Sequence, residues 1–96
     1  MIFYINWVMK KIKFTKTFEK SFKKRILPYP NLSKKFAVRM RIFQDDARNP
    51  LLRSHALVGS KVGKRAFSVG GDLRVIYTED ENSIIFYDVG SHNQVY

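Results

Sequence analysis

Two histidines are the side chains of this 96-residue sequence best suited to acid–base chemistry. Imidazole is the only side chain whose ordinary pKa, about 6.5, lets it take up and release a proton near neutral pH. His92 follows Gly90 in a polar segment after an expected strand, where a side chain is exposed and positioned by a rigid scaffold. His55 is equally compatible with a polar surface residue or with packing between a helix and a strand. The sequence therefore offers proton transfer, with His92 as the first candidate.

Arg74 is a charged residue inside an expected strand, a position that needs either an acidic partner or a bound anion. Asp72, two residues earlier on the same face of the strand, could be that partner. It could equally be a hairpin residue beside a Gly70-Gly71 turn. A guanidinium without a carboxylate partner would suit a phosphate, because its planar fork matches two oxygens at once. The two residues thus predict a salt bridge or an anion site.

The composition excludes several kinds of site. The chain has no cysteine, which rules out disulfides, thiolate metal sites and dithiol redox chemistry, and a reducing cytoplasm is the expected location. Two histidines without a carboxylate cluster disfavour a metal enzyme. Gly70-Gly71 has the form of a turn and not of a phosphate loop. We therefore expect neither a metal nor a small-molecule cofactor.

Positive charge is concentrated in the first half of the chain. The net charge is +10, and the first 48 residues hold 13 of the 18 lysines and arginines but only three of the eight acidic residues. Such a surplus of positive charge attracts polyanions at long range. The commonest is nucleic acid, and anionic membranes and acidic proteins are less common partners. Solubility alone is the plainer explanation. We expect nucleic acid to be the partner.

At this length the chain is expected to form a single domain. The expected fold begins with a strand and a helix. Residues 11–15 alternate charged and apolar side chains, the pattern of a half-buried strand. Thr15 or Thr17 can then cap a helix, and Pro28 and Pro30 end it. The apolar stripe of this helix has a spacing of four residues and consists of Phe18, Phe22 and Ile26.

A second amphipathic helix follows directly. Asn31 or Ser33 can cap it, and Asn49-Pro50 stops it. Its apolar stripe consists of Leu32, Phe36, Met40 and Phe43. Two such helices in a row predict a helical hairpin.

From residue 64 the pattern changes to strands. Gly70-Gly71 is a two-residue hairpin turn, and residues 79–82 form a longer one. The three expected strands run over residues 64–69, 72–78 and 83–89. The fold class is therefore α+β, with an N-terminal strand, a helical hairpin and then a three-stranded antiparallel sheet. With the helices on one face of the sheet, the other face is left free for a site.

The hairpin turn decides which residues share a face. If Gly70-Gly71 is the whole turn, one face carries Arg65, Phe67, Val69, Asp72, Arg74 and Ile76. The opposite face carries Lys64, Ala66, Ser68, Leu73, Val75 and Tyr77, and it makes the better core because its apolar members are central. We therefore expect the set with the two arginines on the helix-free face. A slip of one residue would exchange the two faces.

The first nine residues, Met1 to Met9, form an apolar run that is too short to span a membrane. The charges of Lys10 and Lys11 follow this run, whereas in a secretory signal they precede it, and no small-residue cleavage site follows. No membrane partner is expected. Residues 1–8 are either a strand extension or the product of an upstream start, and residues 9–96 are the expected domain.

Three motifs follow one another in the second half of the chain. They are Leu52-Arg-Ser-His55-Ala-Leu57-Val-Gly59, then Gly63-Lys-Arg-Ala-Phe67-Ser-Val-Gly-Gly71-Asp72-Leu-Arg74-Val-Ile-Tyr77, then Phe86-Tyr-Asp-Val-Gly90-Ser-His92-Asn-Gln-Val-Tyr96. With their intervals, they resemble the RelE/StbE branch of the RelE/ParE superfamily of bacterial type II toxins, close to its YafQ-like members, over residues 10–96. The resemblance implies a compact, microbial ribonuclease-like α+β fold, metal-independent cleavage of mRNA at the ribosome that inhibits translation, and an antitoxin that silences the chain.

The resemblance also implies roles for single residues. It points to His92 as the main acid–base residue, with His55 and Asp72 as further members of the site. Similarity to RelE itself implies Arg74 as the phosphate-binding arginine and Tyr96 as a site tyrosine, although Tyr96 could equally serve packing. RNA cleavage without a metal needs a base for the 2′-hydroxyl, a cation for the phosphorane and an acid for the departing 5′-oxygen. We expect His92 to be the acid and Asp72 or His55 the base, or the residue that orients the base. Arg74 would clamp the phosphate, and the products would be a 2′,3′-cyclic phosphate and a 5′-hydroxyl.

Basic residues outside this site are expected to contact the ribosome and its RNA and to take no part in the chemistry. They are Lys20, Lys23, Lys24, Arg39 and Arg41 on the helices, and Arg65 at the start of a strand.

Two positions depart from the YafQ-like pattern. Ser68 stands where those toxins have a third histidine, and Asp88 where they have an arginine, a positive charge that Arg74 could supply. A ParE-type toxin, which shares the fold but inhibits DNA gyrase and cleaves nothing, is the alternative function; it needs no acid–base set. A non-toxic RNA-binding module is a third possibility, but the chain lacks an aromatic RNP-type strand and a GxxG loop.

Overall fold

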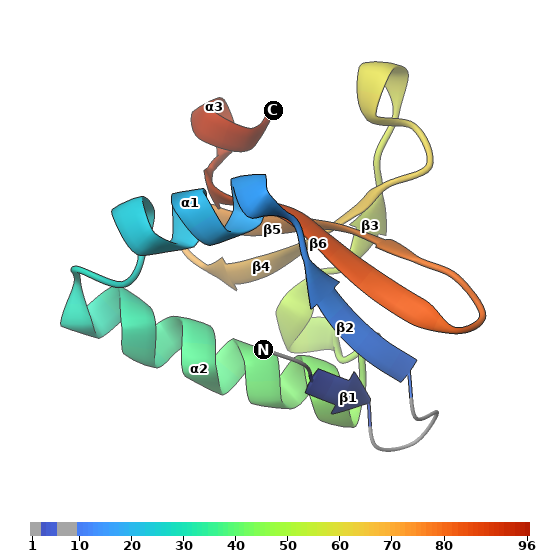
Figure 1. Cartoon of the computed structure of the whole chain (residues 1–96), viewed down its shortest axis with the longest axis horizontal. Coiled ribbons are helices and arrows are strands. Elements are labelled where there is room, and N and C mark those ends of the chain that lie inside the picture. The colour runs from blue at the N-terminus through green and yellow to red at the C-terminus, as the bar shows by residue number, and fades with distance from the viewer. Residues whose placement is uncertain (1–2, 6–9) are drawn as a thin grey trace.

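The computed structural model describes residues 3–5 and 10–96 of the chain. In chain order the elements are β1 (Phe3–Ile5), β2 (Lys10–Phe14), α1 (Lys16–Arg25), α2 (Pro30–Asp45), the 3-10 turn η1 (Pro50–Leu52), β3 (His55–Ala56), the 3-10 turn η2 (Gly59–Lys61), β4 (Arg65–Gly70), β5 (Leu73–Glu79), β6 (Ser83–Ser91) and α3 (His92–Val95). Figure 1 shows α2 on one side of the sheet, and α3 with the loop between β3 and β4 on the other.

Within the described ranges, the strands form one six-stranded sheet with the order β1-β2-β6-β5-β4-β3. The α+β class and the antiparallel run of β4, β5 and β6 are confirmed. The first predicted strand, β2, pairs in parallel with β6, from Lys11 opposite Ser83 to Phe14 opposite Phe86. Two short edge strands complete the sheet: β1 beside β2, and β3 beside β4. The chain thus returns its last long strand to the centre of the sheet.

Helix α1 begins where a side chain can satisfy its free backbone groups. The Oγ1 of Thr15 accepts a hydrogen bond from the backbone N–H of Phe18 at 3.0 Å, which makes Thr15 and not Thr17 the cap. Lys23, Lys24 and Arg25 occupy the last turn, where positive charge opposes the negative end of the helix dipole.

Helix α2 begins differently from the sequence-based expectation, which was wrong for the caps. The helix starts at Pro30, and its N-cap Tyr29 makes no side-chain capping bond. Proline suits the first helical position because its φ angle is already helical and its missing N–H has no partner to lose there. The hydroxyl of Ser33 instead donates a hydrogen bond to the carbonyl of Ile26 at 3.2 Å, in the segment before the helix. No helix in the described ranges has the length and apolar character needed to cross a membrane.

The register of the β4–β5 hairpin also corrects the expectation. Gly70 pairs with Leu73 and Ser68 with Arg74, with a bulge between Ser68 and Gly70, so the turn is Gly71-Asp72. Gly70 and Gly71 both have positive φ angles, 134° and 53°, which glycine adopts without strain. This one-residue shift exchanges the two faces of β4, whereas the residues of β5 lie on the faces expected for them.

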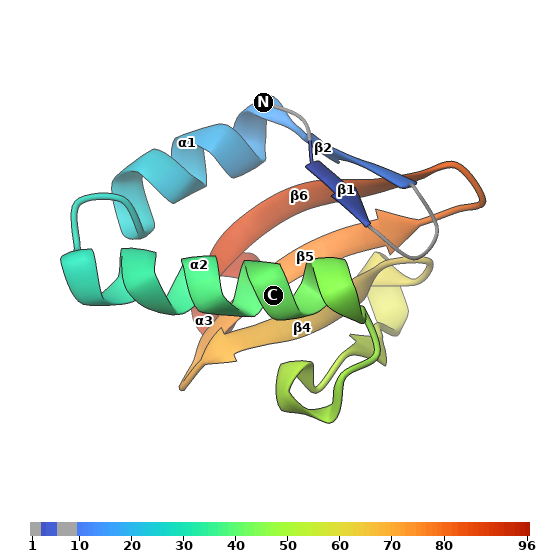
Figure 2. The ribbon, with the colours of Figure 1, turned by 90° about the horizontal axis from the view of Figure 1, so that it is seen from below.

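The face toward α1 and α2, here called the covered face, carries Phe67, Val69, Val75 and Tyr77; the opposite face, the open face, carries Ala66, Ser68, Arg74 and Ile76. Figure 2 shows α2 lying across the strands of the covered face. The large apolar side chains of β4 and β5 therefore face the helices, because that arrangement removes the most apolar surface from water.

An aromatic cluster forms the core between the helices and the covered face. The ring of Phe43 from α2 lies 4.7 Å from that of Phe67 and 5.2 Å from that of Tyr77, measured between centroids. Phe86 of β6 packs edge-on against Phe43 at 5.6 Å. Offset and edge-to-face contacts of this kind add to the stabilisation from burial alone.

A second, smaller apolar cluster lies on the open face. Val95 of α3 packs with Ala66 and Ile76, and Leu57 lies against them. The C-terminal helix is therefore fixed to the sheet by one buried side chain, and its other residues stay exposed. This contact positions the end of the chain above the open face.

Candidate functional site

The candidate site begins where β6 passes into α3. Ser91 and Gln94 form a reciprocal capping box, in which the backbone N–H of Ser91 donates to Oε1 of Gln94 at 2.8 Å. His92 is the first residue of the helix and is exposed. A Cβ on Gly90 would lie only 2.7 Å from Oε1 of Gln94 and 2.8 Å from Nη1 of Arg25, so a side chain at this position would displace these groups. The local sequence thus sets the position of His92.

The hairpin turn brings Asp72 to the start of α3. Leu73 pairs with Ser91 across the sheet, and the backbone N–H of His92 donates to Oδ2 of Asp72 at 3.4 Å. The carboxylate thereby touches the backbone that carries the imidazole. Asp72 and His92, which are 20 residues apart in sequence, are neighbours in the fold.

Arg74 lies next to this pair on the open face, opposite Gly90. Its guanidinium donates to the carbonyl oxygens of Gly71 at 2.9 Å and Leu73 at 3.1 Å. It forms no ion pair within the described ranges, so the salt bridge considered for Asp72 and Arg74 is not made. A guanidinium held by carbonyls keeps its positive charge uncompensated, and it is therefore able to bind an anion.

Tyr96 joins the same group through the last turn of α3. Its ring meets that of His92 edge-on, with 4.3 Å between centroids. Burial raises the pKa of the Tyr96 hydroxyl, although the positive charge of Arg74 acts in the opposite direction.

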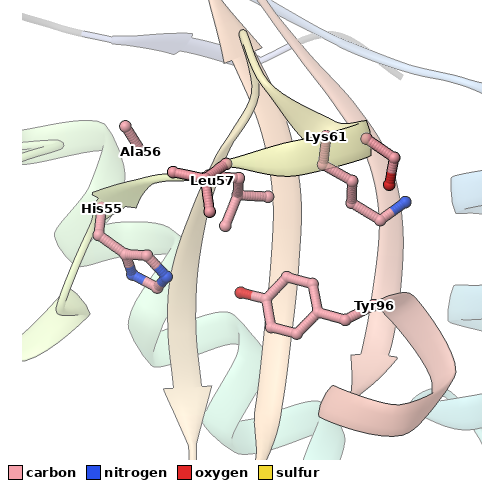
Figure 3. Close-up of a pocket in the computed structure, with 7 residues that line it drawn as sticks. His55, Ala56, Leu57, Lys61 and Tyr96 are labelled. Carbon is pink, nitrogen blue, oxygen red and sulfur yellow. The ribbon is translucent and has the colours of Figure 1, made fainter.

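His55 reaches the site from the opposite edge of the sheet. It lies on β3 opposite Ala66 and, together with Tyr96 and Lys61, lines a cavity of about 320 Å³. Figure 3 shows the hydroxyl end of Tyr96 directed toward the side of the cavity where His55 lies. Nδ1 of His55 is 3.0 Å from the carbonyl oxygen of Arg53. Because a carbonyl can only accept, Nδ1 carries the proton, and Nε2 of the neutral ring is left as an acceptor.

The structure places the five residues that were predicted to be catalytic in two adjoining groups. Asp72, Arg74, His92 and Tyr96 lie around the start of α3. His55 lies on β3 and shares a cavity with Tyr96. Sequence reasoning missed Lys61, which lines the same cavity. A basic residue between Gly59 and Gly63, in a loop beside a predicted strand, was the available signal.

Arg65 is separate from this group. The corrected register puts it on the covered side, where Nε donates to Oγ of Ser54 at 3.2 Å and to the hydroxyl of Tyr77 at 3.3 Å. The expectation that Arg65 and Arg74 share a face was therefore wrong, because the turn is shifted by one residue. Arg65 here braces the segment after α2 against the sheet.

The two departures from the expected pattern have local explanations. Ser68 is buried, and its hydroxyl accepts a hydrogen bond from the backbone N–H of Gly70 at 3.2 Å, within the bulge. Asp88 pairs with Arg25 of α1 at 3.4 Å, and Arg25 also donates to the carbonyl of Val89 at 3.0 Å. A guanidinium is therefore present beside Gly90, but it comes from α1.

The predicted ribosome-binding residues of the helices are mostly exposed. Lys20, Lys23, Lys24 and Arg41 are exposed, and Arg39 is half-buried and donates to the carbonyl of Leu51. In the parts of the chain that the structure describes, no three histidine or acidic side chains come together as metal ligands would.

Comparison with known proteins places these features in a family. Residues 10–96 match the family described as bacterial toxin of type II toxin-antitoxin system, YafQ. No curated protein matches the chain. Among solved structures, YafQ from E. coli strain BL21(DE3) is similar with a TM-score of 0.74 and 20% identity, over 91% of this chain and 98% of that one.

Two further solved structures share the fold. The E. coli DinJ-YafQ toxin-antitoxin complex matches with a TM-score of 0.72 and 21% identity, over 91% of this chain and 97% of that one. The YoeB/ParE toxin from Agrobacterium tumefaciens matches with a TM-score of 0.70 and 14% identity, over 88% and 99%. The fold is thus that of RelE/ParE-like toxins. Since the family model spans almost the whole chain, the chain belongs to the YafQ family of toxins of type II toxin–antitoxin systems.

Proposed function

We propose that this toxin is a ribosome-associated, metal-independent endoribonuclease that cleaves mRNA in the cytoplasm, inhibits translation and is silenced by a cognate antitoxin. The observation that carries the proposal is the convergence of two histidines, a carboxylate, an unpaired guanidinium and a tyrosine on the open face. They include the base, the cation and the acid that RNA cleavage without a metal requires, and they come from three separate segments of the chain.

The cleavage step assigns one role to each group. Nε2 of neutral His55 takes the proton of the 2′-hydroxyl, and the 2′-oxygen attacks the adjacent phosphorus. Arg74 binds the phosphate and stabilises the charge that builds up on the phosphorane. His92, initially protonated, gives its proton to the 5′-oxygen as the bond to phosphorus breaks. The products are a 2′,3′-cyclic phosphate and a 5′-hydroxyl.

Asp72 and Tyr96 act through His92 in this scheme. Asp72 accepts a hydrogen bond from the His92 backbone and so holds the start of α3, which makes it a positioning residue. The Tyr96 ring restricts the imidazole by its edge-on contact. Fixing the acid in one orientation lowers the entropic cost of reaching the transition state.

Binding to the ribosome is assigned to the outer surface of α1 and α2. Lys20, Lys23, Lys24 and Arg41 are exposed there, and the first half of the chain carries most of the basic residues. Phosphate contacts of this kind give affinity without sequence selectivity. The E. coli YafQ structure in complex with DinJ supports an antitoxin as a second partner of this chain.

The decisive experiment is mapping of 5′-hydroxyl RNA ends after induction of the toxin without antitoxin. His92→Gln keeps the size and hydrogen bonding of the side chain but cannot transfer a proton, so cleavage should fall roughly 10²- to 10⁴-fold while the fold and antitoxin binding persist. Arg74→Ala should cost about 10²- to 10³-fold, since the phosphorane charge loses its cation. Asn93→Gln, the exposed neighbour of His92, is the control and should cleave like the parent.

Two outcomes would contradict the proposal. Cleavage by His92→Gln at the parent rate would put the acid elsewhere. A parent chain that cleaves no RNA while DNA supercoiling falls would mean that the ParE-type alternative, inhibition of gyrase, is correct.

A further inference from the structure

A second cavity opens on the sheet beside α3. It measures about 260 Å³ and is lined from three directions. Thr17 comes from the start of α1, Lys61 and Lys64 from the loop before β4, and Tyr87, Asp88 and Val95 from β6 and α3. Lys61 also lines the cavity of His55 and Tyr96. The two cavities therefore adjoin at this lysine, on the face that carries the proposed chemistry.

Tyr87 is aimed into this cavity by an irregularity of the sheet. Asp88 pairs with Ile76 and Phe86 with Tyr77, which leaves Tyr87 as the extra residue of a bulge. Bulges of this type turn a side chain out of the regular alternation. The backbone is held firmly, since the hydroxyl of Thr15 donates to the carbonyl of Tyr87 at 3.0 Å. An aromatic ring is thus fixed at the cavity wall.

Lys64 adds a positive charge to this ring. Its Nζ lies 4.9 Å from the centroid of the Tyr87 ring. A cation–π contact at a partly exposed site is weak, so it can be exchanged for a phosphate without a large loss. Tyr87 offers a surface for stacking, and Lys61 and Lys64 are placed to neutralise the backbone of the same nucleotide.

Asp88 supplies a hydrogen-bond acceptor at the cavity. Its Oδ1 accepts from the backbone N–H of Val89 at 2.8 Å and pairs with Arg25, while Oδ2 accepts no hydrogen bond from any residue that the structure describes. A carboxylate oxygen accepts from the exocyclic amino groups of cytosine, adenine and guanine. Uracil has no such group.

We infer that this cavity binds one nucleobase of the RNA chain, stacked on Tyr87 and selected by Asp88 for an exocyclic amino group. The inference rests on the proposed function, because it adds a base-recognition subsite to the same RNA. A volume of about 260 Å³ lies below the usual range for whole ligands, which suits a single base with its phosphate left outside on the lysines.

The test measures binding separately from cleavage. Fluorescence anisotropy of labelled hexaribonucleotides of cytidine, adenosine or uridine is recorded with the full chain carrying His92→Gln, so that the RNA stays intact. Adding Tyr87→Leu should weaken binding of the cytidine and adenosine oligomers roughly 5- to 100-fold, whereas Tyr87→Phe keeps the stacking surface and should stay within about 2-fold. Tyr29→Leu, at an exposed tyrosine in the turn between α1 and α2, is the matched control and should bind like the parent.

Asp88→Asn tests the selection of the base. It should reduce the preference for cytidine over uridine about 5-fold or more, with thermal melting used to verify that loss of the Arg25 pair has not unfolded the chain. Asp45→Asn, on the exposed end of α2, is its control. Parent-like binding by Tyr87→Leu, or no binding of any oligomer by the His92→Gln chain, would overturn the subsite. Normal oligomer binding by a parent chain that cleaves no mRNA on ribosomes would sink only the proposed function.

Discussion

The two faces of the sheet differ in how they use their apolar side chains. The covered face buries an aromatic cluster against α1 and α2, with Phe43, Phe67, Tyr77 and Phe86 all below 2% exposure. The open face buries only Ala66, Ile76 and Val95 as a cluster, and these hold α3 in place. The covered face therefore stabilises the fold, whereas the apolar contacts of the open face position α3. Changes that break or sharpen this contrast are considered next, from the largest expected effect to the smallest.

Two isoleucines give a matched comparison of the faces. Ile84 is fully buried in the main core, and Ile76 is 2% exposed in the small cluster under α3. Ile84→Ala should lower the free energy of unfolding by about 3–5 kcal/mol, a large part of the stability of a small domain. Ile76→Ala should cost about 2 kcal/mol and should also reduce cleavage, because α3 and His92 lose their support. Urea unfolding and end mapping measure both, and equal cleavage per folded molecule in the two variants would contradict the contrast.

The covered face could be predicted from the sequence to the level of elements. The stripes of Phe18, Phe22 and Phe36 follow helical periodicity, and that signal survives an error of one or two residues at the helix ends. The cap of α2 could not be predicted, because Tyr29 has no capping side chain and Pro30 was interpreted as a stop. The pairing of β2 with β6 could not be predicted either, because it depends on contacts between residues far apart in sequence.

The open face depended on the register of one hairpin, which was predicted wrongly. Both two-residue turns, Gly70-Gly71 and Gly71-Asp72, are compatible with glycine, and they place opposite sets of β4 side chains on the same face as Val75 and Tyr77. Arg74 lies on the open face as expected, and Phe67 is buried instead of open because its burial outweighs the regular turn. Asp72 and His92 are less sensitive to the register, since each sits at an element boundary.

Charge reversal on the outer surface of the helices should weaken ribosome binding and leave the chemical step of cleavage unchanged. The double change Lys20→Glu with Lys24→Glu should weaken association with ribosomes about 10-fold or more and flatten its dependence on salt, since fewer counterions are released. Lys11→Glu with Lys13→Glu, on exposed positions of β2, is the matched charge control. Single-turnover cleavage at saturating ribosome should change little. Loss of the chemical step with binding intact would mean that the site lies on the helical side.

Lowering the pH should reduce the stability of the fold through a carboxylate on the covered side of the sheet. Glu79 pairs with Lys10 at 3.1 Å and with Arg48 at 3.1 Å; burial opposes its charge, but these two cations hold its pKa below the ordinary value. A lowered pKa contributes stability that is present above about pH 4.5 and is lost as the pH falls through the folded-state value. Glu79→Gln should therefore cost about 1.5–3 kcal/mol at pH 7 and less at pH 3. Urea unfolding at both pH values measures the difference, and a cost that is the same at both would show that it does not depend on the charge of Glu79.

Removing residues 1–8, so that the chain begins at Met9, should have the smallest effect. The change deletes β1, which pairs with β2 through three positions from Phe3 to Ile5 at the end of the sheet farthest from β3. Because β2 separates β1 from β6, the open-face residues keep their neighbours, and the loss should be about 1 kcal/mol, a drop in melting temperature of about 4–8 °C. Growth arrest and end mapping after induction should match the full chain, as expected if residues 9–96 are the toxin domain. A truncated chain that is folded but cleaves no RNA would show instead that β1 is a working part of the site's scaffold.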